Sequence, residues 1–354
     1  MTAPEDYAAR RYLSVGEAAR VLGITVAELH ALARNSEVPA YRAASGQYRF
    51  ERQALERLVQ EGRFPGSAAA ESNPPRHWDL ETHGTRQRIF VADARDMHHL
   101  DDNSVHLMVT SPPYFDAKMY TPTPLDGDLG DIHDLETWLQ EIGKVWAEVY
   151  RVLQPGRKAF INIMNLPVRQ NGTFRSLNLV GKTIDLCEGL GFVFKREIIW
   201  HKTNSVRAHF GTYPYPGSIL LNFAHEFILE FEKPAPKHYR KYAHLTPEQR
   251  EASKLDKAFW LAIKKSDVWT LKPEESGGRR SHVAPFPYEL PERLIRAYSF
   301  VGETVLDPFA GSGTTLLAAR DLGRHGVGYE IVPEIAQQAA QRLVETPPRS
   351  SAMP

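Results

Sequence analysis

The tetrapeptide Ser111-Pro112-Pro113-Tyr114 follows an apolar run that begins at Val105. Two consecutive prolines remove two backbone donors and fix two φ angles, so neither a helix nor a central strand continues through them. The pattern predicts a strand that ends in a rigid corner carrying a small hydroxyl and an aromatic ring. Two interpretations are open at this point: a turn whose tyrosine packs on the surface, and a rigid pocket for a flat molecule.

A second unusual stretch reads DPFAGSGTT, beginning at Asp307 at the end of a short apolar run. Gly311 and Gly313 let the backbone approach a ligand closely, and the helix expected to follow would offer unpaired N–H groups to an anion. Glu330 ends a later run, 23 residues after Asp307, about where an acidic side chain meets ribose hydroxyls in a Rossmann-like unit. The loop lacks the lysine of a P-loop, which disfavours hydrolysis of a nucleoside triphosphate. It also lacks the full G-x-G-x-x-G, which weakens the interpretation as a dinucleotide-binding loop.

Taken together, TSPPY and DPFAGSGTT resemble the motifs of the S-adenosylmethionine-dependent DNA amino-methyltransferases, and the resemblance covers about residues 86–345. One departure is Arg157, where this family commonly shows a second glycine after Pro-Gly; we expect it to lie away from the site and to change little. The catalytic motif precedes the cofactor motif, which is the permuted order of the β class. In that class the intervening segment, here 203–281, is the target-recognition region.

The resemblance implies transfer of a methyl group from S-adenosylmethionine to an exocyclic amine of a base flipped out of double-stranded DNA. Such an amine is a poor nucleophile because its lone pair is conjugated with the ring. Acceptors that hold its two protons favour the pyramidal nitrogen needed for attack. In this chain the implied acceptors are the Ser111 hydroxyl and the Pro112 carbonyl, Pro113 keeps the corner rigid, and Tyr114 stacks on the base.

The same resemblance implies the cofactor contacts. Five residues of the glycine-rich stretch would meet the methionine part of the cofactor: Asp307, Phe309, Gly311, Gly313 and Thr314. Glu330 would bind the ribose, and Asp93, which ends the strand before the catalytic one, would meet the adenine. Phe286 and Pro287 would wall the pocket. The alternatives are that Asp93 caps a helix and that Phe286 is ordinary core.

Serine at position 111 is typical of the N4-cytosine enzymes and aspartate of the N6-adenine enzymes, so N4 of cytosine is the expected target and N6 of adenine the alternative. A rival from another class is a DNA-binding regulator with an inactive methyltransferase body, and methylation of RNA or protein is a third hypothesis. The recognition sequence, a paired restriction endonuclease and the oligomeric state (monomer or dimer) stay open.

Strand-like runs alternate with amphipathic helices along most of the chain, which predicts an α/β fold with a mostly parallel sheet and helices on both faces. The resemblance implies the Rossmann-like methyltransferase fold with seven strands. Strands are expected at 88–93, 105–111, 158–165, 193–201, 219–231, 304–307 and 326–330. Residues 63–77, rich in Pro, Ser, Ala and Gly, predict a linker before a methyltransferase domain over 78–354.

Residues 1–62 predict a small separate DNA-binding module. Ser14 begins a capping-box pattern for a first helix, Gly23 ends it, and Thr25 caps a second one. A hairpin over 39–50 and a third helix follow. The segment resembles the winged helix-turn-helix of excisionase and MerR-like proteins, and a helical module for protein contacts is the alternative.

The formal net charge of the chain is zero, yet its distribution is uneven. Residues 201–281 carry 14 Lys/Arg and 9 Asp/Glu, which is compatible with a DNA-contacting region. Seven basic residues are the expected phosphate contacts: Lys202, Arg207, Lys237, Arg240, Lys241, Arg279 and Arg280. A solvated face is the alternative for each of them.

Composition narrows the remaining possibilities. The chain has no apolar run long enough to span a bilayer and no signal-peptide pattern, so a cytoplasmic location is expected. The single cysteine, Cys187, rules out an internal disulfide and lacks the preceding proline that covalent C5-cytosine methylation uses. The histidines lack metal-ligand spacing, and we therefore expect no metal site.

Overall fold

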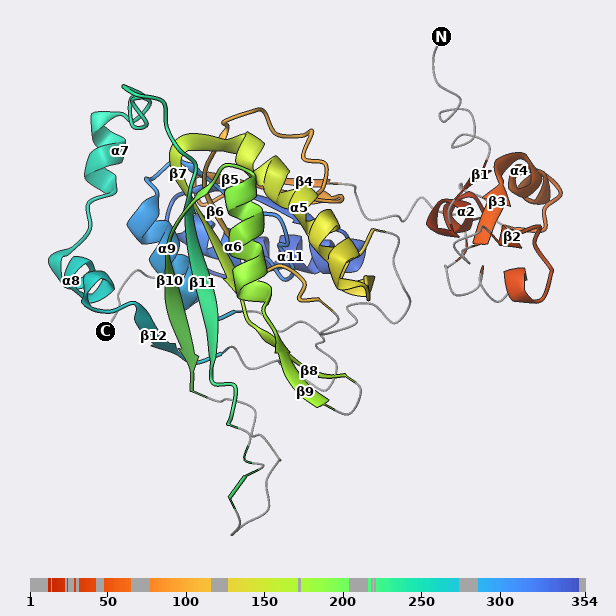
Figure 1. Ribbon diagram of the computed structural model, residues 1–354. Coiled ribbons are helices and arrows are strands. Elements are labelled where there is room, and N and C mark those ends of the chain that lie inside the picture. Colours follow the sequence, from red (N-terminus) through yellow and green to blue (C-terminus); the bar gives the residue numbers. More distant parts are fainter. Residues whose placement is uncertain are drawn as a thin grey trace. The chain divides into compact units, whose positions relative to one another are not determined.

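The computed structural model describes residues 12–13, 15–22, 24, 29, 32–42, 48–64, 77–115, 127–170, 173–203, 216–217, 219, 221–273 and 286–349. Two compact units divide the chain. Residues 1–74 and 121–131 belong to the smaller unit, and residues 75–120 and 132–354 to the larger one. Figure 1 shows the helices and strands of both.

The smaller unit contains a three-stranded antiparallel sheet and helices, with further helical residues at 29 and 32–34. Its strands, in spatial order, are β1 (Tyr12–Leu13), β3 (Tyr48–Glu51) and β2 (Tyr41–Arg42). Its helices are α2 (Val15–Leu22) and α4 (Arg52–Gln60). Leu13, Leu22, Phe50 and Leu55 are buried against one another, which gives this unit its own core.

These elements confirm the predicted first helix, the hairpin and the third helix. The predicted cap Ser14, the helix stop Gly23 and the second cap Thr25 lie outside the described residues.

The larger unit is built on one nine-stranded sheet. From edge to edge its strands are β12 (Val268–Leu271), β10 (Val193–Lys202), β11 (His225–Glu232), β7 (Leu153–Ile163), β6 (Val105–Thr110), β13 (Thr304–Asp307), β14 (His325–Glu330), β5 (Thr85–Val91) and β4 (His77–Thr82). Three neighbouring pairs are antiparallel, namely β10–β11, β11–β7 and β5–β4, and the other five are parallel.

Helices cover both faces of this sheet. On one face lie α5 (Leu135–Val152) and α6 (Leu179–Gly189), and on the other α9 (Glu289–Tyr298), α10 (Thr314–Asp321) and α11 (Pro333–Glu345) pack together (Figure 1). Two shorter helices, α7 (Pro247–Ala252) and α8 (Lys257–Lys265), connect β11 to β12. A hairpin of β8 (Leu166–Gln170) and β9 (Thr173–Leu177) follows β7, and a 3-10 helix η2 (Leu129–Asp131) precedes α5.

The expected number of seven strands is wrong, because the sheet has nine. The sheet is mixed, and most of its neighbouring pairs are parallel. One additional strand, β4, turns back onto β5 through His83 and Gly84, whose φ angles of 49° and 71° suit a tight hairpin turn. The other, β12, pairs with β10 and lies inside the segment expected to read DNA. Both additions are short edge strands with alternating exposure, a pattern too weak to identify from sequence.

The unusual sequence motifs meet at one edge of the sheet. Ser111 follows β6, Asp307 ends β13, Glu330 ends β14 and Asp93 follows β5, and these four strands are parallel neighbours. Parallel neighbours end at the same edge, which is where open α/β sheets bind ligands. We call this edge the motif edge.

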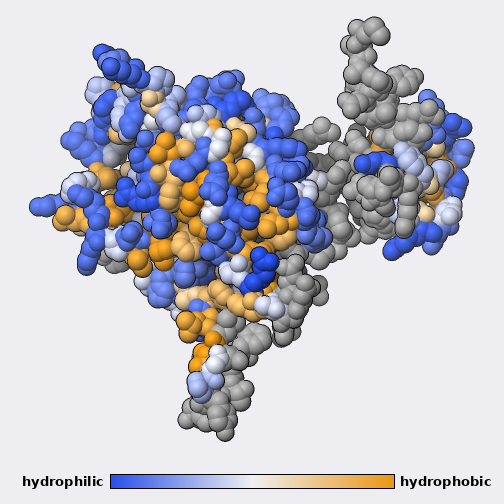
Figure 2. Space-filling view, viewed as in Figure 1, coloured by the Kyte–Doolittle hydropathy of each residue, from blue (hydrophilic) through white to orange (hydrophobic). Residues whose placement is uncertain are grey.

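No helix in the described part of the chain is long and apolar enough to cross a membrane. Hydrophilic and hydrophobic residues intermix over the visible face of the larger unit (Figure 2).

Candidate active site

The Ser-Pro-Pro-Tyr loop, residues 111–115, leaves the carboxyl end of the central strand β6. Pro112 and Phe115 are buried, and the other three residues of the loop are half-buried. The Phe115 ring stands edge-on to Trp138 of α5, with 6.2 Å between ring centroids. Phe115 therefore packs the loop against α5, while Ser111 and Tyr114 remain partly accessible.

The hydroxyl of Tyr114 contacts the side chains of Glu226, Asn162 and Ser111, and Lys202 pairs with Glu226. The Tyr114 hydroxyl donates to Glu226 Oε2 at 2.7 Å, and Asn162 Nδ2 donates to the same carboxylate oxygen at 2.7 Å and to the Tyr114 hydroxyl at 3.1 Å. Lys202 Nζ donates to the other oxygen, Glu226 Oε1, at 2.8 Å. Ser111 Oγ lies 3.4 Å from the Tyr114 hydroxyl. The loop is thus joined to β7, β11 and β10 by polar contacts.

Asp307 connects the two motifs directly. The hydroxyl of Thr110, the residue before Ser111, donates to Asp307 Oδ1 at 2.6 Å, and Thr315 Oγ1 donates to Oδ2 at 2.6 Å. The side chain is 2 % exposed. Burial raises the pKa of Asp307 to about 6, and the hydrogen bonds it accepts limit that rise. The carboxyl group therefore holds the glycine-rich loop against the Ser-Pro-Pro-Tyr loop.

The glycine-rich loop, residues 307–313, has the backbone that its sequence predicts. Gly311 and Gly313 have φ angles of 50° and 78°, and α10 begins directly afterwards. Glu330 closes the loop from the next strand, because its two oxygens accept from the N–H groups of Gly311 (3.0 Å) and Val332 (2.9 Å). The predicted contacts Gly311, Gly313 and Glu330 are therefore brought together.

Two other predicted residues of this loop point at neighbouring helices. The half-buried Phe309 ring stands edge-on to Trp146 of α5, with 6.2 Å between centroids. Thr314 is buried, and its hydroxyl accepts from Arg342 Nη1 of α11 at 2.9 Å. Both side chains fasten the loop to the helical layers.

The remaining predicted cofactor residues have neighbours of their own within the larger unit. Asp93 accepts from Arg95 Nε at 2.9 Å, and Arg95 also pairs with Glu141 of α5. Phe286 and Pro287 are buried at the start of α9, and Phe286 belongs to the hydrophobic core of the unit. Their contact with a cofactor stays a prediction.

The predicted DNA-binding residues separate into three groups. Lys202 lies at the motif edge, paired with Glu226. Lys237, Arg240 and Lys241 follow β11, which is antiparallel to β7 and so delivers them to the opposite edge: the main-chain oxygen of Lys233, the residue after β11, accepts from the Gly156 N–H in the first half of β7. The structure does not bring these three near the Ser-Pro-Pro-Tyr loop. Arg207, Arg279 and Arg280 lie outside the described residues.

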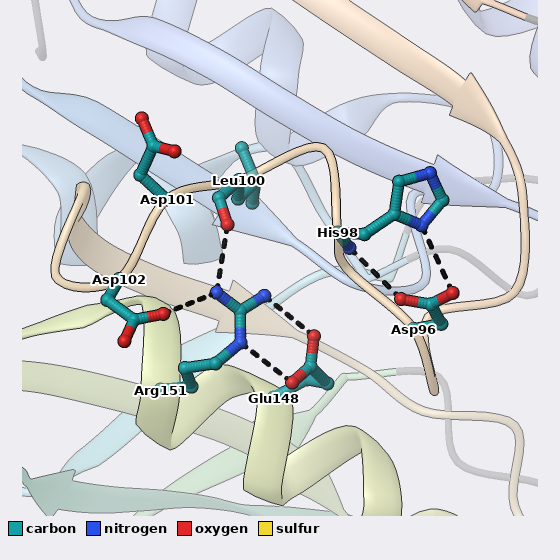
Figure 3. A pocket seen from close by; sticks show the side chains of 7 residues that line it. All are labelled: Asp96, His98, Leu100, Asp101, Asp102, Glu148 and Arg151. Atoms are coloured by element: carbon teal, nitrogen blue, oxygen red, sulfur yellow. Dashed lines mark hydrogen bonds and ion pairs between the residues drawn. The ribbon is translucent and has the colours of Figure 1, made fainter.

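An open hollow of about 550 Å³ has no residue of either motif loop in its lining (Figure 3). It is lined by Asp96, His98, Leu100, Asp101, Asp102, Glu148 and Arg151. Arg151 is occupied, since it donates to Glu148, Asp102 and the Leu100 carbonyl at 2.7–2.9 Å. The mainly acidic lining would repel DNA phosphates, so we assign these residues to fastening the β5–β6 connection onto α5.

A group of three potential metal ligands lies near the amino ends of β6 and β13. His106, His244 and Glu303 bring their ligand atoms within 4.8 Å of one another. Glu303 already forms a buried ion pair with Arg157, and His106 Nδ1 accepts from the Thr304 N–H at 3.1 Å. Burial and the Arg157 charge lower the pKa of His106 to about 3. We interpret the group as a structural cluster, and the absence of a metal site stays a prediction.

Sequence analysis missed Asn162 and Glu226. Asn162 is a lone polar residue near the end of the apolar strand β7 and is 2 % exposed, which is the kind of signal that marks a site. Glu226 is the second residue of β11, and the sequence around it gives no local signal. The β8–β9 hairpin beyond β7 was also not predicted.

Comparisons with known proteins agree with this geometry. The profile of the DNA methylase family that includes N6 and N4 enzymes matches residues 105–341, and a helix-turn-helix domain profile matches residues 12–63. The type II methyltransferase M.MjaI of Methanocaldococcus jannaschii is 35% identical over 286 residues, covering 70% of this chain and 88% of that protein.

Solved structures share the fold. TTHA0409 of Thermus thermophilus, assigned as a DNA modification methylase and solved with S-adenosyl-L-methionine, is 39% identical with a TM-score of 0.58, covering 72% of this chain and 92% of that one. The PvuII cytosine-N4-specific DNA methyltransferase is 19% identical with a TM-score of 0.54, covering 73% and 86%, and shows the fold alone. With its two motif loops joined at one sheet edge, this chain belongs to the DNA methylase family and carries an N-terminal helix-turn-helix domain.

Proposed function

We propose that the chain transfers a methyl group from S-adenosylmethionine to the exocyclic N4 amine of a cytosine flipped out of double-stranded DNA. The observation that carries this proposal is the 2.6 Å hydrogen bond between Thr110 and Asp307, since it places the beginnings of the two motif loops side by side. A methyl donor and an amine acceptor held by these loops would be neighbours, and such proximity is a large part of catalysis.

The glycine-rich loop fits the cofactor. The left-handed glycines lead the chain into the amino end of α10, and the first N–H groups of a helix suit a carboxylate. Glu330 offers acceptors for ribose hydroxyls. S-adenosylmethionine supplies an electrophilic sulfonium methyl. The proposed contacts are Phe309, Gly311, Gly313, Thr314, Glu330, Asp93, Phe286 and Pro287. Asp307 has both oxygens engaged within the protein, and we propose that it acts by holding the loop.

Within the base pocket, Ser111 and the Pro112 carbonyl would accept the two amine protons, and the Tyr114 ring would stack on the base. Acceptors for both protons favour a pyramidal nitrogen whose lone pair can attack the methyl group. The preference for cytosine over adenine rests on Ser111 at the first position of the motif. Adenine N6 is the alternative target.

For DNA recognition we propose two separate segments in place of one continuous region over 203–281. Residues 225–271 contain β11, α7, α8 and β12 of the larger unit. Lys202 and Leu271 pair with each other at the carboxyl ends of β10 and β12, and Phe227 pairs with Ile163 at the carboxyl end of β7. Strands β10 and β12 therefore end, and β11 begins, at the motif edge, and we propose the sequence segments that adjoin these ends, 203–224 and 272–285, for DNA recognition.

For the domains, we propose a DNA-binding module over 1–62, a linker over 63–77 and a methyltransferase domain over 78–354. The profile match at 12–63 and the start of β4 at His77 support these boundaries. Single-molecule sequencing of DNA from cells that express the full chain, and a chain starting near residue 75, would test what the module adds. An identical pattern and extent of methylation would contradict a role of the module in DNA modification.

Mass spectrometry of nucleosides from DNA treated with the full chain and S-adenosylmethionine tests the activity. We expect N4-methylcytosine with the wild type and none with Ser111→Ala. N6-methyladenine without N4-methylcytosine would contradict the cytosine preference. It would still support methyl transfer to an exocyclic amine. Absence of both products, together with intact DNA binding, would support the alternative of a DNA-binding regulator.

A further inference from the structure

Glu226 is the common acceptor of the polar contacts beneath the Ser-Pro-Pro-Tyr loop. Glu226 is the second residue of β11, opposite Trp200 of β10, and it is 9 % exposed. It accepts from three donors, Tyr114, Asn162 and Lys202, at 2.7–2.8 Å. Short contacts from several donors are typical of an ionised carboxylate, because charge strengthens each hydrogen bond.

An ionised carboxylate sets the direction of the hydrogen bonds around it, because it can only accept. The single hydroxyl proton of Tyr114 therefore goes to Glu226. The main-chain carbonyl of Asn162 and Ser111 Oγ are both farther from the Tyr114 hydroxyl, at 3.4 Å. The amide of Asn162 is oriented in the same way, since a flipped amide would place its oxygen against the carboxylate.

The direction of hydrogen-bond donation extends from Tyr114 to Ser111. With its proton given to Glu226, the Tyr114 hydroxyl oxygen is an acceptor toward Ser111 Oγ, 3.4 Å away. Catalytic contacts are often this long without substrate and shorten in the complex. When Ser111 donates to Tyr114, one lone pair of its oxygen faces Asn162 Nδ2 at 3.5 Å, and the other is left for an incoming donor. An exocyclic amine is such a donor.

We propose that Glu226 is a positioning residue that acts through Tyr114 to keep Ser111 an acceptor for the target amine. The inference rests on the proposed amino-methyl transfer and deepens it. The residue takes no part in bond making: it determines which way the protons of Tyr114 and Ser111 point before the amine arrives.

The test compares Glu226→Gln, Tyr114→Phe and the double variant, each in the full chain. Glutamine keeps the shape of the side chain and can donate, so the direction of the contacts is lost. Phenylalanine keeps the ring and removes the hydroxyl that connects Glu226 to Ser111. The matched control is Glu230→Gln, a buried glutamate four residues along β11 that pairs with Lys158 and does not touch the loop.

The readouts are the single-turnover rate of tritiated methyl transfer to whole-genome-amplified DNA, S-adenosylmethionine affinity by calorimetry, and the melting temperature. We expect each single variant to lower the rate roughly 100-fold, as small misplacements at a reacting centre do. Cofactor affinity should stay within about twofold, since the contacts lie on the base side. The double variant should be no slower than the slower single variant, because both changes break one chain of contacts.

Each result that differs from these expectations has its own meaning. A double variant whose loss is the product of the two single losses would overturn the inference, because Glu226 would then act independently of Tyr114. So would a wild-type rate in Tyr114→Phe, which does not depend on how Glu226→Gln folds. An equal loss of rate in Glu230→Gln would assign the effect to stability. A wild type that methylates no DNA would instead refute the proposed function.

Discussion

Replacing Asp307 by asparagine should change how the stability of the larger unit depends on pH. The carboxyl group is fully buried, and its pKa is raised from 3.8 to about 6, chiefly because burial penalises the charged form. It accepts from Thr110, Thr315 and the Phe309 N–H. Asparagine removes the ionisable group and keeps nearly the same shape.

The expected magnitude follows from the two pKa values. A difference of about two units between the folded chain, at about 6, and the ordinary value of 3.8 corresponds to about 3 kcal/mol. Because the folded chain binds this proton more tightly than the unfolded chain, the contribution of Asp307 to stability is greatest below about pH 4 and is lost as the pH rises through about 6. The asparagine variant should lack this component of the pH dependence.

The variant can retain its contacts. The amide oxygen can accept from Thr110 and the Phe309 N–H, and the Thr315 hydroxyl can turn to the Val109 carbonyl, 3.5 Å away. A constant difference in unfolding free energy from a weakened hydrogen bond, about 1 kcal/mol, would leave the pH dependence unaffected.

Urea unfolding followed by tryptophan fluorescence measures the effect in the full chain. All six tryptophans lie between residues 78 and 269, so the signal reports the larger unit. We expect the difference in unfolding free energy between variant and wild type to change by about 2.5 kcal/mol from pH 4 to pH 7.5, with the variant gaining relative stability at the higher pH. Parallel curves of unfolding free energy against pH for variant and wild type would refute the reasoning. The ¹³C chemical shift of the Asp307 carboxyl group provides an independent titration.

Three further predictions address the site, the core and the cysteine. Ser111→Ala should lower turnover roughly 100-fold with unchanged cofactor affinity by calorimetry, because one acceptor for the amine is lost; equal losses of turnover and affinity would argue against a base-side role. Arg157→Met should lower the unfolding free energy by roughly 3–5 kcal/mol in urea, since it leaves buried Glu303 without its charged partner. Cys187, whose pKa is raised by burial, should react with a thiol reagent at pH 8 only after unfolding, and rapid reaction of the folded chain would contradict the packing of α6.

Local patterns in the sequence predicted the parts of the site that lie on continuous segments. The strand Thr304–Asp307 has the predicted bounds, and the glycines at 311 and 313 adopt the predicted left-handed backbone. Both outcomes depend on neighbouring residues alone, because an apolar run favours a strand and only glycine turns left-handed at little cost. The expected position of Arg157 away from the motif loops also holds. Its burial against Glu303, at 2 % exposure, was not expected.

Contacts between distant segments were not predictable in this way. Glu226 meets Tyr114 across 112 residues of sequence, and Asn162 meets it across 48. Their meeting depends on β11 and β7 lying next to each other in a particular register, which is a property of the assembled sheet.

The sequence by itself determined the family, the two motif loops and the strands that end in them, since these follow from residue types at short spacing. Tertiary structure decided the rest. The antiparallel course of β11 carries Lys237, Arg240 and Lys241 away from the motif edge and brings Glu226 to it, although the four residues lie within 16 positions of one another. The physical reason is that strand direction and register are chosen by packing and hydrogen bonding over the whole sheet, to which each residue contributes only a small part.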